Sequence, residues 1–171
     1  MSKDERIILT GFMGVGKSTV AKCLSYILRT EKIDLDRYIE ANARRSITEI
    51  IEQDGEDDFR RIETESLREI LAQTDIKIIS LGGGAWIPPE NRSLIRHYQC
   101  TTVWLESTFE HCWRNISCSK QNRPLAKNKK LAQSLFDERQ KFYCLADWHF
   151  IVKPEFSSFE VAKKIAEEVF G

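Results

Sequence analysis

The nine residues from Gly11 to Thr19 constrain this chain more than any other stretch. They read Gly-Phe-Met-Gly-Val-Gly-Lys-Ser-Thr and fill every fixed position of the phosphate-binding template G-x-x-x-x-G-K-[ST]. Glycines allow successive backbone N–H groups to turn toward an anion, and a helix that starts there adds its N-terminal donors. We therefore predict a nucleotide-phosphate site made by six residues: Gly14, Val15, Gly16, Lys17, Ser18 and Thr19.

Two of these residues have distinct predicted roles, and the surrounding sequence supports them. Lys17 should reach the β and γ phosphates, and Ser18 should offer a hydroxyl ligand to Mg²⁺, which prefers oxygen ligands. The apolar residues 7–9 predict a buried strand before the loop. Apolar residues at helical spacing follow the loop: Val20, Leu24, Ile27 and Leu28. The motif therefore has the strand–loop–helix setting that it requires.

Composition limits the remaining possibilities. The 171 residues suffice for one domain, which we predict over 1–171, with a core that needs no disulfide or structural metal. Lys plus Arg and Asp plus Glu both number 26, so the net charge of zero favours neither nucleic acid nor anionic lipid. The first six residues do not resemble a signal peptide, and no run approaches the roughly 18 apolar residues of a membrane span. We expect a cytoplasmic protein.

Five short apolar runs alternate with helical patterns along the chain. They cover residues 7–9, 33–36, 77–81, 101–105 and 148–152. No internal repeat, linker or low-complexity segment interrupts the alternation. The pattern predicts an α/β fold of three αβα layers, with a five-stranded parallel sheet covered on both faces.

The second of these runs contributes the first candidate acids. In a strand over 33–36, alternation would place Asp34 and Asp36 on one side of the sheet. The carboxyl ends of parallel strands are where open α/β sheets bind ligands, so both acids are candidates for chemistry. A pair of solvated turn acids is the alternative.

Two arginines lie close to the start of a helix predicted from about Asp57. Arg60 and Arg61 follow a cluster of acidic residues there. A cation in the first helical turn opposes the helix dipole, so at least one of them should have an anionic partner. That partner is either one of the neighbouring acids or a bound ligand.

Three consecutive glycines, Gly82 to Gly84, follow the third predicted strand. They cost conformational entropy and pack no side chain, which indicates a tight turn or a close approach of backbone to a ligand. A plain flexible turn is the alternative interpretation.

A basic segment follows the helix predicted after the fourth strand. Residues 119–130 are polar, and Pro124 interrupts any helix there. The cations of this segment are Lys120, Arg123, Lys127, Lys129 and Lys130. We predict a mobile lid over about residues 118–130 that closes on the bound phosphates.

Other classes of phosphate-binding protein fit the sequence poorly. GTPases need N-K-x-D and D-x-x-G, but the chain offers only Asn128-Lys129-Lys130-Leu131 and no D-x-x-G. The apolar strand ending in Asp that motor and transporter ATPases use is also missing. A small phosphoryl-transfer enzyme with a lid remains, and Asp34 is the acid placed to hold the waters of Mg²⁺.

Six motifs, in order and at similar spacing over nearly the whole chain, resemble the shikimate kinase family. They are Gly11 to Thr19, Asp34-Leu35-Asp36 with Ile39-Glu40, Gly55-Glu56 leading to Phe59-Arg60-Arg61-Ile62-Glu63, Gly82 to Gly84, Arg123-Pro124-Leu125, and Arg139 ahead of Tyr143. The resemblance implies ATP-dependent phosphorylation of the 3-hydroxyl of shikimate, a step of aromatic amino-acid biosynthesis. It also implies a P-loop kinase fold with a mobile lid, and ATP and Mg²⁺ as co-substrate and cofactor.

The resemblance also assigns the shikimate site. Arg60 and Arg139 are implied as a clamp for the substrate carboxylate, a task suited to guanidinium groups. The glycine segment, Gly82, Gly83 and Gly84, is implied as part of the same site, with the Gly83 N–H as a donor. Asp36 is implied to accept hydrogen bonds from the substrate hydroxyls and to orient or deprotonate the attacking oxygen.

The catalytic residues on the phosphate side are implied in the same way. Lys17 and the lid residue Arg123 should stabilise charge on the transferred phosphoryl group, and Arg123 should also bind ATP. Ser18 should ligate Mg²⁺ directly, and Asp34 should hold it through water. Lys153-Pro154 falls where the family has its adenine-contacting loop.

The sequence departs from the family pattern at three points. Arg29 ends the first helix where the family usually has glycine, Ala126 replaces a leucine in the lid, and only 16 positions separate Arg123 from Arg139. A kinase for another hydroxy acid such as gluconate, and a catalytically silent nucleotide-binding regulator, are the alternative functions. We expect a monomer that binds shikimate and ATP, with neither nucleic acid nor membrane as partner.

Overall fold

A five-stranded parallel sheet organises the protein. The computed structural model describes residues 5–119 and 128–171. The strands are β1 (Ile7–Thr10), β2 (Glu31–Asp34), β3 (Ile76–Ser80), β4 (Thr101–Glu106) and β5 (Trp148–Ile151). Their order in the sheet is β2-β3-β1-β4-β5, and every pair is parallel. Ile8 of β1 lies between Ile79 of β3 and Thr102 of β4. The predicted α/β class with a five-stranded parallel sheet is confirmed.

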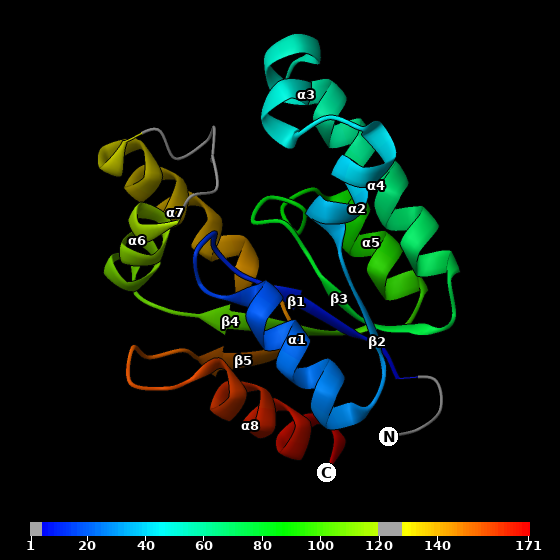
Figure 1. Ribbon diagram of the computed structural model, residues 1–171, viewed down its shortest axis with the longest axis vertical. Helices are drawn as coiled ribbons and strands as arrows, with labels where there is room; N and C mark the ends of the chain where they lie inside the picture. The colour runs from blue at the N-terminus through cyan, green and yellow to red at the C-terminus, as the bar shows by residue number, and fades with distance from the viewer. Residues whose placement is uncertain (1–4, 120–127) are drawn as a thin grey trace.

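Helices cover both faces of this sheet. They are α1 (Lys17–Leu28), α2 (Leu35–Ala43), α3 (Ile47–Asp54), α4 (Glu56–Ala72), α5 (Pro89–His97), α6 (Phe109–Cys118), α7 (Lys129–Tyr143) and α8 (Ser158–Phe170). Figure 1 shows α1 and α8 side by side in front of the sheet, with α4, α5 and α7 behind it. One cluster of buried apolar residues fills the space between these layers. Within the described residues, no helix is long and apolar enough to span a bilayer.

The second strand differs from its prediction over 33–36. β2 covers Glu31–Asp34, and Leu35 already begins α2. Asp34 has extended backbone and caps that helix, since its Oδ1 accepts a hydrogen bond from the Arg37 N–H at 3.3 Å. Leu35 turns into the core, where it is fully buried. Asp36 therefore lies in the first turn of a helix, and strand alternation does not explain its position beside Asp34.

Local signals place the other elements that surround the site. A Ser46–Glu49 capping box starts α3, and Gly55 both ends α3 and begins α4 at φ 93°. The predicted lid over 118–130 is too wide at both ends. Cys118 belongs to α6, and Lys129 and Lys130 begin α7. The central part of the predicted lid, residues 120–127, lies outside the described residues, and so do Arg123 and Ala126.

Arg29, noted above as a departure, occupies a position that favours glycine. It caps the C-terminus of α1 in the left-handed region, at φ 51° and ψ 51°. A Cβ in this region is crowded by the neighbouring carbonyl oxygen, and glycine is the usual residue there. The sequence difference therefore has a local cost in stability.

We predict that Arg29→Gly raises the free energy of unfolding by about 1 kcal/mol, because glycine removes the Cβ crowding. Urea unfolding of the variant and the parent protein measures the difference. Arg29→Ala serves as the control, since alanine removes the long side chain but keeps the Cβ. An equal gain in Arg29→Ala would contradict the backbone explanation.

Candidate active site

A cavity extends from the predicted phosphate loop to Asp36, Gly82 and Gly83 of the predicted acceptor side, whereas Gly84, Arg60 and Arg139 are not among its lining residues. It has a volume of about 650 Å³ and lies where the chain leaves the carboxyl ends of β1, β2 and β3. Its lining comes from the loop before α1, the start of α2, the turn after β3, α6, and the segment between β5 and α8. All six predicted phosphate-binding residues line it: Gly14, Val15, Gly16, Lys17, Ser18 and Thr19. The carboxyl edge of a parallel sheet is the expected place for such a cavity.

Glycine is required at the tip of the phosphate loop for two reasons. Gly14 has φ 80°, a left-handed conformation that favours glycine. A Cβ at Gly14 would also lie 2.6 Å from the Cys112 carbonyl oxygen of α6. Helix α6 therefore packs directly against the loop, and only a residue without a side chain fits between them.

Lys17 begins α1 with its side chain folded over the loop. The Nζ group donates hydrogen bonds to the carbonyl oxygens of Gly11 at 2.7 Å and Phe12 at 3.0 Å. The residue is only 8% exposed. The ammonium group is thus held at the base of the phosphate loop, in the cavity wall, as the predicted role of Lys17 requires.

Ser18 and Asp34 meet beside this loop, as the predicted metal site requires. The Ser18 hydroxyl donates to Asp34 Oδ2 at 2.5 Å, and both residues line the cavity. Within the described residues, no group of three His, Cys, Asp or Glu side chains could hold a metal ion. A pair of oxygen donors on an open cavity fits Mg²⁺, which keeps several of its waters, better than it fits a closed zinc site.

Asp36 has the most strongly perturbed acid group in the cavity. Burial, together with the negative charges of Asp34 and Glu63, raises the pKa of this carboxyl from its ordinary value of 3.8 to about 7. The positive charge of Lys17 acts in the opposite direction. A carboxyl group with a pKa near neutral can exchange a proton with a substrate hydroxyl at physiological pH.

The turn at Gly82 to Gly84 brings the predicted acceptor residues together. An added Cβ would lie 2.5 Å from Asp36 Oδ1 at Gly82, 3.2 Å from Arg139 Nη1 at Gly83, and 2.5 Å from Arg60 Nη2 at Gly84. None of these three glycines has a left-handed φ. Three polar side chains lie directly against the turn, so a side chain at Gly82 or Gly84 would displace Asp36 or Arg60. The groups that approach the turn closely are side chains of the protein itself, and the predicted approach of a ligand to this backbone stays a prediction.

Arg60 already has acidic partners on its own helix. Its Nη1 donates to Glu63 Oε2 at 2.7 Å, and its Nη2 lies 3.5 Å from Glu56 Oε1. Glu63 is 1% exposed, and burial raises the pKa of its carboxyl while Arg60 lowers it. Arg61 pairs with Asp58 at 2.9 Å on the exposed side of α4. Both arginines therefore pair with neighbouring acids, which was one of the two possible kinds of partner. Arg60 also reaches the glycine turn.

Arg139 differs from Arg60 in its charge environment. It lies in α7 and is only 6% exposed. No carboxylate in the described part of the chain forms an ion pair with it, although its charge acts at a distance on Glu63 and lowers the pKa of that carboxyl. A buried guanidinium without an ion-pair partner is costly. An anionic ligand that arrives at the glycine turn would compensate this charge.

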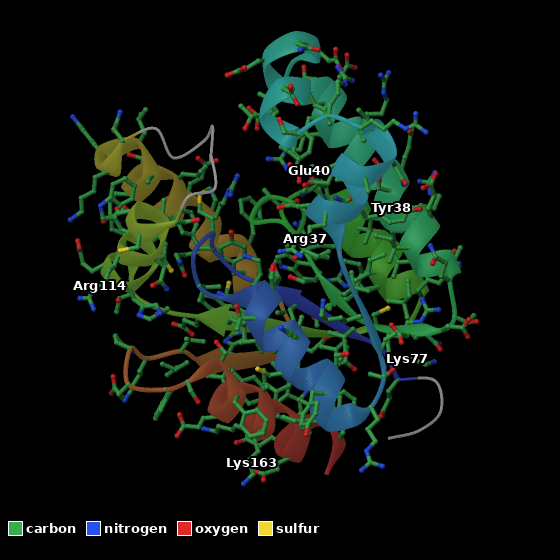
Figure 2. All side chains as sticks on the ribbon, viewed as in Figure 1. Arg37, Tyr38, Glu40, Lys77, Arg114 and Lys163 are labelled. Atoms are coloured by element: carbon green, nitrogen blue, oxygen red, sulfur yellow. The ribbon has the colours of Figure 1, made fainter. Side chains whose placement is uncertain are left out.

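Several residues of the cavity were not predicted from the sequence as site residues. Asn115 of α6 donates from Nδ2 to the Gly14 carbonyl oxygen at 2.8 Å, and it lines the cavity together with His111. Arg37 and Glu40 come from α2, as Figure 2 shows, and also line it. Glu40 belongs to one of the six motifs but was not assigned to the site, and no short motif marks Asn115, His111 or Arg37, because their place in the cavity depends on how α2 and α6 pack. Lys153, named for the adenine loop, does not line this cavity, whereas Val152 and Phe156 do.

Comparison with known proteins identifies relatives along nearly the whole chain. The family model for shikimate kinase matches residues 13–170. The shikimate kinase of Lactococcus lactis subsp. cremoris (strain MG1363) is 42% identical over 163 residues, which cover 95% of this chain and 96% of that protein. A solved structure of the Acinetobacter baumannii shikimate kinase in complex with shikimate has a TM-score of 0.88 at 28% identity, covering 96% of this chain and 92% of that chain.

A more distant structural likeness concerns the fold alone. A gluconokinase from Sinorhizobium meliloti 1021 has a TM-score of 0.60 at 16% identity, covering 99% of this chain and 98% of that chain. At this level of identity the shared architecture carries no information about the acceptor.

The perturbed carboxyl at Asp36 leads to a prediction about stability and pH. Because its pKa of about 7 in the folded protein exceeds its ordinary value of 3.8, the folded state binds more protons than the unfolded state between these values. The carboxyl should therefore lower stability increasingly as pH rises from about 4 to 7. We predict that Asp36→Asn is roughly 2–4 kcal/mol more stable than the parent protein at pH 8, with the gain lost near pH 4.

Urea unfolding at pH 4, 6 and 8 measures this difference. A stability difference that stays constant across the three pH values would contradict the burial of an ionisable group at Asp36.

Proposed function

The chain belongs to the shikimate kinase family and is an enzyme that phosphorylates shikimate with ATP in aromatic amino-acid biosynthesis, and we propose that the cavity beside the phosphate loop and the adjoining glycine turn hold both substrates. In this proposal the ATP phosphates lie over residues 11–19, and shikimate lies against the glycine turn. The observation that carries the proposal is the meeting of Asp36, Arg60 and Arg139 at that turn. Gly82 and Gly83 of this turn line the same cavity as the phosphate loop, and so does Asp36.

Arg60 and Arg139 are proposed to bind the shikimate carboxylate. Their guanidinium groups lie against neighbouring glycines, Gly84 and Gly83, so they can converge on one anion. Glu63 fixes the orientation of Arg60 by occupying Nη1, and Nη2 faces the turn. Arg139 has no competing ion pair within the described residues. Charge-assisted bonds from two guanidinium groups give a carboxylate both affinity and a fixed orientation.

Asp36 is proposed to act on the substrate hydroxyls. Its carboxylate accepts a hydrogen bond from the attacking hydroxyl and takes its proton as the oxygen bonds to the γ-phosphorus of ATP. The bond between that phosphorus and the bridging oxygen breaks, and ADP leaves with the electron pair. The pKa of about 7 places the carboxyl close to balance between accepting and releasing this proton. Asp36 lies against Gly82, which fixes it on the acceptor side of the cavity.

The phosphate side is proposed to work by positioning and by charge. The backbone N–H groups from Gly14 to Thr19 bind the phosphates, and Lys17 places its ammonium beside them. Arg123 is proposed to reach the transferred phosphoryl group from the lid, and it lies outside the described residues. Ser18 and Asp34 would hold Mg²⁺, the latter through water. When bound, the ion neutralises charge on the phosphates.

The alternative functions have weaker support. The likeness to the gluconokinase is one of fold, whereas the relatives with high coverage and identity are shikimate kinases. Retention of Asp36, Lys17 and the two arginines argues against a silent regulator. The monomeric state, the cytoplasmic location, the single domain over 1–171 and the absence of nucleic-acid and membrane partners stay predictions.

We predict that Arg139→Ala raises the shikimate KM by about 10- to 100-fold, the cost of losing a charged hydrogen-bonding partner, and leaves the ATP KM within about twofold. Release of ADP by purified enzyme with ATP and Mg²⁺, with shikimate or gluconate offered separately, is the measurement. Arg61→Ala is the control, because Arg61 is exposed and pairs with Asp58 on the outer side of α4.

Equal losses for ATP and shikimate in Arg139→Ala would show that the clamp is misplaced. ADP release by the parent enzyme with gluconate but not with shikimate would contradict the assignment of the acceptor side.

A further inference from the structure

The glycine turn is fixed to the end of α7 by two hydrogen bonds that the catalytic assignment does not use. The Tyr143 hydroxyl donates to the Gly83 carbonyl oxygen at 2.5 Å. The Trp86 indole N–H donates in the opposite direction, to the Phe142 carbonyl oxygen at 2.8 Å. Tyr143 lies four residues after Arg139 on the same helix. The helix that carries one arginine of the clamp is therefore bonded to the turn that this arginine lies against.

A second pair of hydrogen bonds connects the same segment to α4. Asn91, at the start of α5, is fully buried and donates from Nδ2 to the Ala85 carbonyl oxygen at 2.9 Å. Its Oδ1 accepts a hydrogen bond from the Thr64 hydroxyl at 2.8 Å. Thr64 lies one turn after Arg60 on α4. The helix that carries the other arginine is thus linked to the turn through Asn91.

From this arrangement we infer that Tyr143 and Asn91 are positioning residues for the acceptor: they hold the turn between α7 and α4 and so set the separation of the Arg139 and Arg60 guanidinium groups. The inference rests on the proposed function of these arginines as the carboxylate clamp. A clamp for one small anion works only if both guanidinium groups are held in place before binding.

Core packing alone does not account for these polar atoms. A phenylalanine ring would fill the volume of Tyr143, which is fully buried and packs on Trp104 with ring centroids 6.1 Å apart. A buried hydroxyl or amide is costly unless it is hydrogen-bonded, and a leucine at Asn91 would avoid that cost. Burial raises the pKa of Tyr143 to about 12, so its hydroxyl stays protonated and remains a donor. Both side chains use their polar atoms to hold the same turn.

The test removes the Tyr143 hydroxyl alone. Tyr143→Phe should raise the shikimate KM about 10-fold, the usual consequence of leaving a carbonyl partner unsatisfied, with kcat and the ATP KM each within about threefold. Thr102→Val is the matched control. Thr102 is 3% exposed and its hydroxyl donates to Asp147 at 2.6 Å near the amino end of β4, away from the cavity. This control should lower the thermal midpoint and leave the shikimate KM unchanged.

A double-mutant cycle with Arg139→Lys shows whether the hydroxyl acts through the clamp. The effect of Tyr143→Phe on the shikimate KM should fall to about twofold or less once Arg139 is lysine, because residues that act through one contact are not additive. If Tyr143→Phe does not fold, Thr64→Val provides a second test. This substitution removes the hydroxyl that donates to Asn91, and Thr64 is only partly buried. It should also raise the shikimate KM.

Three outcomes are distinguishable. A selective rise in the shikimate KM that disappears in the Arg139→Lys background supports the inference. Full additivity with Arg139→Lys, or a Tyr143→Phe variant whose kinetics match those of Thr102→Val, overturns the inference and leaves the clamp itself intact. An Arg139→Lys enzyme with an unchanged shikimate KM overturns the clamp, and the inference with it.

Discussion

The proposed acceptor site depends on the absence of side chains at one turn. Gly82, Gly83 and Gly84 have ordinary backbone angles, so conformational freedom does not explain them. What they provide is space, because polar atoms of Asp36, Arg139 and Arg60 lie 2.5, 3.2 and 2.5 Å from the positions that a Cβ would take at Gly82, Gly83 and Gly84. These three side chains come from α2, α7 and α4, helices far apart in the sequence. The turn is the surface on which distant parts of the chain meet to form a site for one small acid.

Charge balance explains why this meeting is stable before a substrate arrives. Buried charges need compensation, and the site alternates acids with bases. Glu63 pairs with Arg60, and Lys17 is bonded to loop carbonyl oxygens. Asp36 accommodates its burial by a raised pKa, whereas Arg139 has no ion-pair partner among the described residues. The residual positive charge on the acceptor side favours an anionic substrate, and shikimate carries a carboxylate.

The sequence predicted the parts of the site that short motifs encode, and it missed those that depend on packing. The phosphate loop could be predicted because glycine spacing and a following lysine are local requirements. The parallel sheet could be predicted from alternating elements, but the order β2-β3-β1-β4-β5 depends on contacts between distant segments. Asp36 was expected on a strand and lies on a helix, because capping by Asp34 ends β2 early. Asn115 and Asn91 carry no motif, since their partners are backbone atoms brought close by the fold.

The most direct measurement of the central claim adds one methyl group to the turn. In Gly84→Ala the new Cβ would lie 2.5 Å from Arg60 Nη2, so the guanidinium must move while the phosphate loop is untouched. Isothermal titration of shikimate and of ATP into this variant and the parent enzyme gives the two dissociation constants. We predict that shikimate binds about 10-fold or more weakly to the variant, consistent with the loss of a charge-assisted bond, and that ATP binding is unchanged. Shikimate binding as tight as in the parent enzyme would contradict it.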